Sequence, residues 1–451
     1  MRFIDPERAL RESAGRCLRD RLSCSPIVVA LSGGVDSVVL LHALLATGVA
    51  VRAFHVNHAL SPHAATWQKF CENLCAELGV EVLVRRLELG TSRTSGLEAD
   101  ARTARYDALR DMARGSSSDI IALAHHADDQ AETVLLQLLR GGASRGLAGM
   151  PEWRIDGAVA LWRPMLGTDR ASIVDYARRR ALAWIDDESN ADLSIKRNFI
   201  RARVLPALEQ GFPDYRAAFG RTASTAAGNS QLLHELAAID IEKATTAEGG
   251  IATEALRTLG VARATNLLRH HLRACRIALP ATDQLCEFIR QAIDSGCQRH
   301  PSVATNDGWL LYADRGQISI AALSANFDAV WHCESTLQLP HGRLVFELSM
   351  GGGIAASRVP STGFRVLARS GGERIKLELN RPHRTLTNLM REAGIPSTLR
   401  SAWPLLVDGD RVVAIPGIGV SVNWRCPSGG PGWTVKWQPR APMSAQSILK
   451  R

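Results

Sequence analysis

The chain has 451 residues, of which 46% are hydrophobic and 22% are charged, a balance typical of folded proteins rather than disordered or fibrous ones. Lys and Arg number 54 against 45 Asp and Glu, and the resulting net charge of +9 is consistent with an anionic partner such as nucleic acid. No run reaches the roughly 18 apolar residues of a membrane span, and no basic region followed by an apolar one opens the sequence. We therefore expect a cytoplasmic protein with no membrane contact.

Apolar strands alternate with helical patterns in the first half of the chain. Residues 27–31 form a short apolar run that ends in a Ser/Gly turn and is followed by a helical pattern over 36–45. Repeated alternation predicts a Rossmann-like parallel sheet with right-handed crossovers and helices on both faces, which is an α/β fold. Further strands are expected at 49–56, 80–87 and 120–124, and further helices at 5–22, 62–78, 97–114 and 128–140.

The pattern changes twice after this region. Residues 217–300 are rich in Ala, Leu, Arg and Gln at helical spacing, whereas short β-like runs separated by Gly and Pro follow from residue 300 onward. The glycines at 351–353 and Ser-Thr-Gly at 361–363 predict a linker. We thus expect an α/β domain at 1–215, a small helical domain at 216–340, a C-terminal α+β, β-rich domain at 363–437, and a loose tail.

The hexapeptide Ser-Gly-Gly-Val-Asp-Ser at 32–37 joins the first strand to its helix. Glycines let backbone amides approach an anion, the hydroxyls of Ser32 and Ser37 can donate to phosphate oxygens, and the helix N-terminus adds a favourable dipole. The segment has neither the Gly-Lys-Ser/Thr ending of a Walker A loop nor a GxGxxG pattern. It predicts a pyrophosphate cradle in which Asp36 holds Mg²⁺. The alternative is an ordinary turn capped by Asp36.

A second polar segment, His-His-Ala-Asp-Asp-Gln at 125–130, follows the fourth strand. In an α/β sheet this strand end faces the same crevice as the first loop. Imidazole and carboxylate groups there could orient an acceptor, stabilise transferred charge or bind metal. His125 and Asp129 are the candidates, with His126 and Asp128 as neighbouring competitors. A core histidine and a helix cap by Asp128 are the alternatives.

Basic residues gather in two further regions. Arg102 and Arg105 share a helix face at i, i+3, a spacing that is also common on solvated basic faces. Between residues 365 and 411, nine Lys and Arg oppose five Asp and Glu, so this stretch carries +4. A guanidinium-rich surface of this kind suits an RNA backbone, although a solvated β-domain surface is the alternative.

The segment 32–37 after an apolar strand resembles the PP-loop signature of the N-type ATP pyrophosphatases, which cleave ATP to AMP and pyrophosphate while adenylating a substrate. Within that superfamily, the segments at 98–106, 187–190 and 196–203 resemble, in order and spacing, those of the tRNA(Ile)-lysidine synthase family. The segments at 364–367, 371–374, 389–396 and 400–405 are similar to the terminal tRNA-contacting domain of that family.

The resemblance implies a ligase that uses ATP and Mg²⁺. C2 of the wobble cytidine in the CAU anticodon of tRNA(Ile) would be adenylated and then attacked by free L-lysine, forming lysidine and switching codon reading from AUG to AUA. ATP would be held by Ser32, Gly33, Gly34, Val35, Asp36 and Ser37, and catalysis would involve Asp36, Arg102, Arg105, His125, Asp129 and Arg197. Lysine selection is assigned to no residue, with Asp186, Asp187 and Glu188 as candidates, and a homodimer is left open.

Three other classes of protein are the alternatives. A tRNA thiolase with the same loop would show paired cysteines for sulfur transfer or an iron–sulfur cluster, but the nine cysteines of this chain include no CxxC pair. A related amidotransferase would bring a glutaminase segment with a nucleophilic cysteine, and none is apparent. A non-catalytic tRNA-binding protein would have no need to keep Asp36 and Asp129 together.

Overall fold

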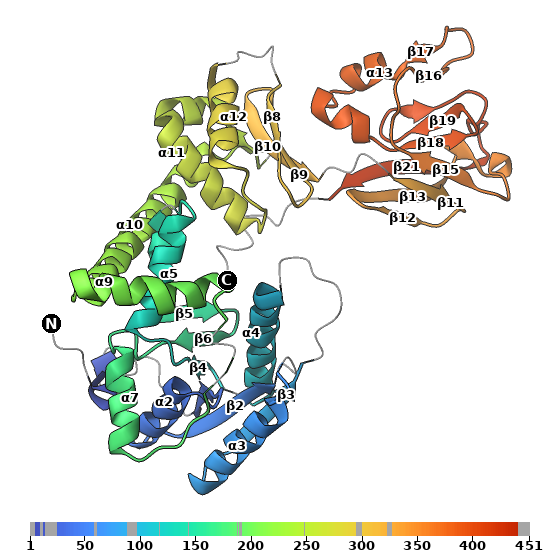
Figure 1. Cartoon of the computed structure of the whole chain (residues 1–451). Helices are drawn as coiled ribbons and strands as arrows, with labels where there is room; N and C mark the ends of the chain where they lie inside the picture. The colour runs from blue at the N-terminus through green and yellow to red at the C-terminus, as the bar shows by residue number, and fades with distance from the viewer. Residues whose placement is uncertain are drawn as a thin grey trace. The chain divides into compact units, whose positions relative to one another are not determined.

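The structure, a computed structural model, divides into two compact units, Met1–Leu232 and Leu233–Arg451, which are described separately (Figure 1). No helix among the described residues is long and apolar enough to cross a membrane. The structure describes residues 5–9, 12–13, 25–57, 61–87, 97–116, 118–142, 144–186, 188, 192–247, 249–294, 300–322 and 327–440. Most of the predicted N-terminal helix at 5–22 and of the tail beyond residue 440 lies outside these ranges.

The first unit is built on a six-stranded sheet with the order β3-β2-β1-β4-β6-β5. The pairs β1–β2, β1–β4, β2–β3 and β4–β6 are parallel, and β5 pairs antiparallel with β6 at the edge. This confirms the predicted Rossmann-like sheet. The strands are β1 (Ile27–Ala30), β2 (Val51–Asn57), β3 (Val82–Arg86), β4 (Ile120–Ala122), β5 (Trp153–Asp156) and β6 (Val159–Trp162).

Helices cover both faces of this sheet (Figure 1). Successive β1 residues point to opposite faces: Val29 packs in one core with α2, α3 and α7, and Val28 packs in the other core with α4. Two-sided burial explains why β1 reads as a continuous apolar run instead of an alternating one. The helices are α2 (Val35–Leu45), α3 (Ala64–Glu77), α4 (Leu97–Gly115), α5 (Ala127–Leu139), α6 (Ser144–Leu147) and α7 (Arg170–Arg179).

A composite helical segment packs against α5 in a small separate core. It consists of α8 (Lys196–Phe199), the π-helical turn η2 (Ile200–Val204) and α9 (Leu205–Gly211). Ile200 and Leu205 bury their side chains against Ala131 of α5. This contact holds the basic stretch that begins at residue 196 beside the first turns of α5.

The second unit begins within α10 (Tyr215–Ala244) and continues with two helices and a four-stranded antiparallel sheet, β7-β10-β9-β8. The sequence predicts only helices before residue 300, but the apolar faces of α11 and α12 share one core with β9 and β10. The middle region is therefore α+β. Its elements are α11 (Thr253–Ala274), α12 (Thr282–Asp294), β7 (Ile251–Ala252), β8 (Ser302–Ala304), β9 (Trp309–Asp314) and β10 (Gln317–Ala322).

The last part of the chain is β-rich, as predicted, with sheets ordered β11-β15-β18-β19-β20 and β12-β13-β21-β14 around a shared aromatic core. Trp331 stacks on Phe346 there with 4.1 Å between ring centroids. The strands are β11 (Asp328–Trp331), β12 (Thr336–Leu339), β13 (Gly342–Met350), β14 (Ile354–Ala355), β15 (Phe364–Leu367), β16 (Arg374–Ile375), β17 (Arg384–Thr385), β18 (Leu405–Asp408), β19 (Arg411–Ile415), β20 (Gly419–Val420) and β21 (Pro431–Pro439), with α13 (Leu386–Glu392), η3 (Ala356–Arg358) and η4 (Ser397–Ala402) between them.

The glycine-rich stretch predicted as a linker is part of this architecture. β14 follows Gly353 directly and pairs with β21. β11 and β13 lie before residue 363 in the sequence, yet β11 pairs with β15 and β13 pairs with β21. A Cβ atom on Gly353 would lie 2.1 Å from the carbonyl oxygen of Trp433, so a glycine is required by close strand approach rather than by flexibility. The linker prediction is therefore wrong, while the domain limits themselves stay predictions.

Candidate active site

The loop between β1 and α2 forms a compact cradle. Ser37 Oγ accepts hydrogen bonds from the amides of Ser32 and Gly33, each at 3.2 Å, and donates one to the carbonyl of Gly34 at 2.9 Å. Gly34 is the N-cap of α2 and provides no side-chain cap, so the helix N-terminus stays open to an anion. The Val35 side chain is buried in the core, which leaves only its backbone N–H to serve a ligand.

Gly33 is required by both its backbone and its surroundings. Its φ is +91°, and a Cβ atom would lie 2.8 Å from Ile185 Cδ1 and 3.2 Å from Cys71 Sγ. The segment after α7 closes on the loop at this point, because the amide of Ile185 donates to the carbonyl of Gly33 at 2.9 Å. A side chain at Gly33 would therefore push the cradle away from the segment that supports it.

Replacing Gly33 by Ala is expected to lower the free energy of unfolding by about 2 kcal/mol and to weaken ATP binding at least about tenfold, because backbone strain and steric contact add. Urea unfolding and ATP titration measure the two effects. Gly48→Ala is the matched control, since Gly48 has a φ of +80° but nothing within 4 Å of the added Cβ. Equal losses in the two variants would show that strain alone is responsible and that contact with Ile185 is irrelevant.

Asp36 lies in the first turn of α2 with its carboxylate incompletely partnered. Oδ1 is buried and has no hydrogen-bond partner among the described residues, and Oδ2 lies 3.8 Å from His126 Nε2. Burial raises the pKa of Asp36, against the opposing effect of His126. A buried carboxylate oxygen without a partner fits a ligand for a cation. No group of three or more His, Cys, Asp or Glu side chains in the described part could hold a metal alone, so substrate phosphates would complete the shell.

His126 and Asp128 have structural contacts. His126 is the N-cap of α5 and forms a capping box with Asp129: the amide of Asp129 donates to His126 Nδ1 at 3.4 Å, and the amide of His126 donates to Asp129 Oδ2 at 3.1 Å. Asp128 accepts from the amide of Arg170 at 2.9 Å and from Arg216 Nε at 2.6 Å. The predicted cap by Asp128 is therefore made by His126 instead, and Asp128 ties α5 to α7 and α10.

Asp129 and Glu132 share two arginines of the α8–η2 segment. Arg197 and Arg201 each donate to Asp129 Oδ1, at 3.0 and 3.1 Å, and their Nε atoms each donate to one oxygen of Glu132 at 2.6 Å. Glu132 is fully buried. Burial raises the pKa of Asp129, but His126 and the arginines outweigh it and lower the pKa to about 2. The cluster is therefore ionised, and it holds both guanidinium groups in fixed orientations.

His125 is positioned by a third arginine. Arg163 Nε donates to His125 Nδ1 at 3.2 Å, so the acceptor nitrogen is unprotonated and Nε2 carries the hydrogen. Burial, which is the largest effect, and the charges of Arg163, Arg197 and Arg105 together lower the pKa of His125 to about 3, against the opposing effect of Asp129. At neutral pH His125 is therefore a neutral hydrogen-bond donor and not a cation.

Arg102 and Arg105 project from α4 beside Tyr106, and each guanidinium carbon lies 5.8 Å from the Tyr106 ring centroid. Burial lowers the pKa of Arg105, and the positive charge of Arg197 acts in the same direction, so these two cations are near neighbours. Arg102 is exposed. The structure thus brings Arg105, His125, Asp129 and Arg197 together and places Arg102 at the rim.

The low pKa of His125 predicts a pH-dependent stability. Native His125 stays neutral down to about pH 3, whereas the unfolded side chain has the ordinary value of 6.5, so the unfolded chain binds more protons between these values. The contribution of His125 to the free energy of unfolding is fully present above the unfolded pKa. It is lost as the pH falls, by up to about 1.4 kcal/mol per pH unit. The gap in unfolding free energy between wild type and His125→Gln is expected to narrow from about pH 7 to about pH 5.

Urea unfolding at each pH measures this gap. His63→Gln is the control, since the His63 side chain is 51% exposed. Parallel pH profiles for wild type and His125→Gln would contradict a neutral, buried His125.

Two of the three candidate lysine-selecting residues, Asp186 and Glu188, lie in the described part of the chain. Asp186 accepts a hydrogen bond from Trp184 Nε1 at 3.3 Å, next to the Ile185 contact with the PP-loop. Glu188 lies 3.6 Å from His63 Nε2 and is 83% exposed. Asp187, Ser189 and Asn190 are outside the described residues, as are the side chains of residues 97–101.

Sequence reasoning missed Glu132, Arg201 and Arg163 as site residues. Two of them had a signal: Glu132 follows Asp129 by three residues and Arg201 follows Arg197 by four, which are the spacings of one helix face. Arg163 follows strand β6 and belongs to none of the quoted motifs, so no local pattern could have identified it.

Strand order, phosphate cradle and the opposing arginine–carboxylate cluster define a PP-loop nucleotide-binding protein. A family model described as a PP-loop domain matches residues 7–208, and models described as the TilS substrate binding domain and the TilS substrate C-terminal domain match residues 252–318 and 364–437. The chain belongs to the tRNA(Ile)-lysidine synthase family.

Three relatives with the name tRNA(Ile)-lysidine synthase are similar over nearly the whole chain. The protein of Nitrosomonas europaea is 37% identical over 426 residues, covering 92% of this chain and 92% of its own length. That of Chromobacterium violaceum is 38% identical over 92% of this chain and 95% of its own. That of Burkholderia pseudomallei is 36% identical over 96% of this chain and 97% of its own.

Proposed function

We propose that this chain is an ATP-dependent ligase that forms lysidine at the wobble cytidine of tRNA(Ile) with a CAU anticodon. The observation that carries the proposal is the juxtaposition of an open PP-loop with an arginine-rich cluster, in a chain that is 37% identical to a tRNA(Ile)-lysidine synthase over most of its length. The C2 carbonyl oxygen of the cytidine attacks the α-phosphate of ATP and pyrophosphate leaves. The amine of free L-lysine then attacks C2 and displaces AMP.

The PP-loop residues bind the triphosphate of ATP. Gly33 and Gly34 let the backbone approach the phosphates, and the amide of Val35 and the exposed hydroxyl of Ser32 donate to the phosphate oxygens. Ser37 holds the loop in shape through its hydrogen bonds. Asp36 is the protein ligand of Mg²⁺, which neutralises charge on the leaving pyrophosphate when it is bound.

The acceptor base lies against the opposite wall of the same crevice. Arg105 and Arg197, with Arg102 at the rim, stabilise negative charge on the transferring phosphoryl group. Neutral His125 donates a hydrogen bond from Nε2 to the base or to a phosphate oxygen. Asp129 orients Arg197 through the 3.0 Å hydrogen bond and, being ionised, does not compete as a proton donor.

The remaining parts of the chain bind the rest of the tRNA. In this proposal the first 215 residues carry the chemistry, while the middle region to residue 340 and the basic module at 363–437 bind RNA. Lysine would be selected by a carboxylate for its amine, with Asp186, Asp187 and Glu188 as candidates. A cytoplasmic location follows from the need for ATP and tRNA, and a homodimer is compatible with this scheme.

Incorporation of radiolabelled lysine into unmodified tRNA(Ile), with ATP and Mg²⁺, tests the proposal directly. We expect label in the RNA that depends on ATP, and no label in tRNA(Met) with the same anticodon sequence. Pyrophosphate release without lysine incorporation would point back to a thiolase, and RNA binding without either signal would point to a binding-only protein.

A further inference from the structure

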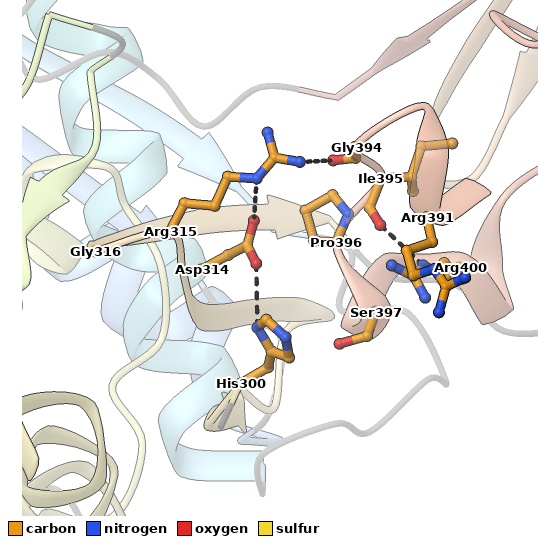
Figure 2. Close-up of a pocket in the computed structure, with 10 residues that line it drawn as sticks. All are labelled: His300, Asp314, Arg315, Gly316, Arg391, Gly394, Ile395, Pro396, Ser397 and Arg400. Atoms are coloured by element: carbon orange, nitrogen blue, oxygen red, sulfur yellow. Dashed lines mark hydrogen bonds and ion pairs between the residues drawn. The ribbon is translucent and has the colours of Figure 1, made fainter. Parts of the chain in front are cut away.

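A cavity of about 470 Å³ in the second unit has a strongly basic lining (Figure 2). It lies between the hairpin turn of β9 and β10 and the segment that joins α13 to η4. Its three arginines and single aspartate give +2 when His300 is neutral. The lining residues are His300, Asp314, Arg315, Gly316, Arg391, Gly394, Ile395, Pro396, Ser397 and Arg400.

The only carboxylate of this lining is already engaged. Asp314 Oδ1 lies 3.1 Å from His300 Nδ1, and its Oδ2 lies 3.8 Å from Arg315 Nε (Figure 2). The Asp314 side chain is only 16% exposed. It therefore neutralises its immediate neighbours and leaves the other two arginines without a counterion from the cavity wall.

Those two arginines have donor groups to spare. Arg391 is exposed, and its guanidinium makes no hydrogen bond or ion pair with any residue that the structure describes. Arg400 donates from Nε to the carbonyl of Ile395 at 2.8 Å, which fixes the guanidinium while its two terminal nitrogens bond to no described residue. Glu392, which lies outside the lining, is the acidic neighbour of Arg391. Two guanidinium groups on one cavity with no counterion in its wall repel each other, and a bound anion would relieve that repulsion.

Arg315 completes the cavity from the opposite side. It occupies the tip of the β9–β10 hairpin with a φ of +48°, followed by Gly316 with a φ of +78°, and donates to the carbonyl of Gly394 at 3.3 Å. Gly394 has a φ of +72°, which favours glycine, and the guanidinium approaches it closely, since a Cβ there would lie 2.7 Å from Arg315 Nη2. The close approach of Arg315 is thus built into both segments.

We propose that this cavity binds a phosphate group of the RNA substrate, held jointly by Arg315, Arg391 and Arg400. The inference rests on the proposed function and names a subsite for its RNA. A volume of 470 Å³ exceeds that of a single phosphate ion and accommodates the attached ribose, for which Ile395 and Pro396 supply an apolar wall. The phosphate is either an internal phosphodiester or the 5′-terminal phosphate of the tRNA.

Binding of the full-length chain to unmodified tRNA(Ile), measured by filter binding at several salt concentrations, tests the proposal. We expect Arg391→Gln and Arg400→Gln each to weaken tRNA binding about tenfold. Each is also expected to reduce the salt slope, the magnitude of the slope of the logarithm of the association constant against the logarithm of the salt concentration, by about one. Arg381→Gln is the matched control, since Arg381 is exposed in the same module, pairs with Glu378 and lies outside the cavity. An affinity and salt slope equal to wild type in the double variant would overturn the proposal.

Ser397→Glu provides a second test that stays valid if the Arg391→Gln/Arg400→Gln double variant does not fold. Ser397 is an exposed residue of the lining, so a glutamate there adds an anion without removing a structural hydrogen bond of Arg400. It is expected to weaken tRNA binding as strongly as loss of one arginine. Unchanged binding by a well-folded Ser397→Glu protein would equally overturn the proposal.

Two further arms identify the source of the phosphate and separate this inference from the proposed function. The first arm removes the 5′ phosphate of the tRNA. If this weakens binding to wild type but not to the Arg391→Gln/Arg400→Gln double variant, the terminal phosphate occupies the cavity. If it weakens binding to neither protein, an internal phosphodiester occupies the cavity. The binding assay needs neither ATP nor lysine. Wild type that binds tRNA through these arginines but forms no lysidine would leave the cavity standing and refute the proposed function alone.

Discussion

Asp36→Asn is expected to lower kcat/KM for lysidine formation by at least about a thousandfold, because loss of the carboxylate removes the protein ligand that holds the cation on the leaving pyrophosphate. The same variant is expected to be at least as stable as wild type in the absence of ATP and Mg²⁺. The reason is that burial raises the pKa of Asp36 and its Oδ1 has no hydrogen-bond partner among the described residues, so the ionised carboxylate is a cost to the folded state.

Lysine incorporation and urea unfolding, measured on the same preparation, check this pair of effects. Asp111→Asn is the matched control, since Asp111 is a 53% exposed aspartate on α4 whose partner is Arg114. The combination of lost activity with retained stability is typical of a functional group and not of a structural one. Activity within about tenfold of wild type would remove Asp36 from the proposed metal site.

Glu132→Gln is expected to lower the free energy of unfolding by about 3–5 kcal/mol, because it removes one of the two carboxylates that Arg197 and Arg201 share and leaves an excess positive charge in a buried cluster. The Glu132 side chain is fully buried, and both of its oxygens accept hydrogen bonds from guanidinium Nε atoms at 2.6 Å. Lysidine formation is expected to fall as well, since Arg197 loses one of the two carboxylates that orient it.

Urea unfolding of Glu132→Gln against Glu77→Gln, an exposed glutamate of α3, measures the effect. The double variant Glu132→Gln/Arg201→Gln provides a sharper check, because removing the excess positive charge should restore part of the lost stability. A loss below about 1 kcal/mol in the single variant would mean that solvent or another group compensates the cluster.

Several features of this protein follow from the sequence alone. The apolar run at 27–31 and the Ser/Gly turn after it identify a buried strand and a phosphate-binding loop, because both depend on local residue type and spacing. The alternation of strands and helices up to residue 140 likewise predicts the parallel sheet, since connection rules leave few other arrangements. Asp36, His125 and Asp129 can be identified from the sequence because they lie in the segments that directly follow predicted strands.

Tertiary structure decided the features that depend on contacts between distant segments. Ile185 supports Gly33 across more than a hundred residues of chain, and Arg163 orients His125 from a different strand. The contact of Asp128 with Arg216, 88 residues further along the chain, shows what this carboxylate binds in the folded protein. No periodicity encodes such pairs, because a local pattern reports which face of an element is apolar and not which element covers it.

The middle and last regions show the same limit. Helical spacing before residue 300 was correct, but the sheet that shares its core comes from strands whose partners only the folded chain reveals. The glycines at 351–353 predict a linker, whereas a glycine is required at residue 353 because the backbone of Trp433 lies too close for a Cβ atom. A glycine serves flexibility and close packing equally well in sequence, and only the neighbouring backbone distinguishes the two.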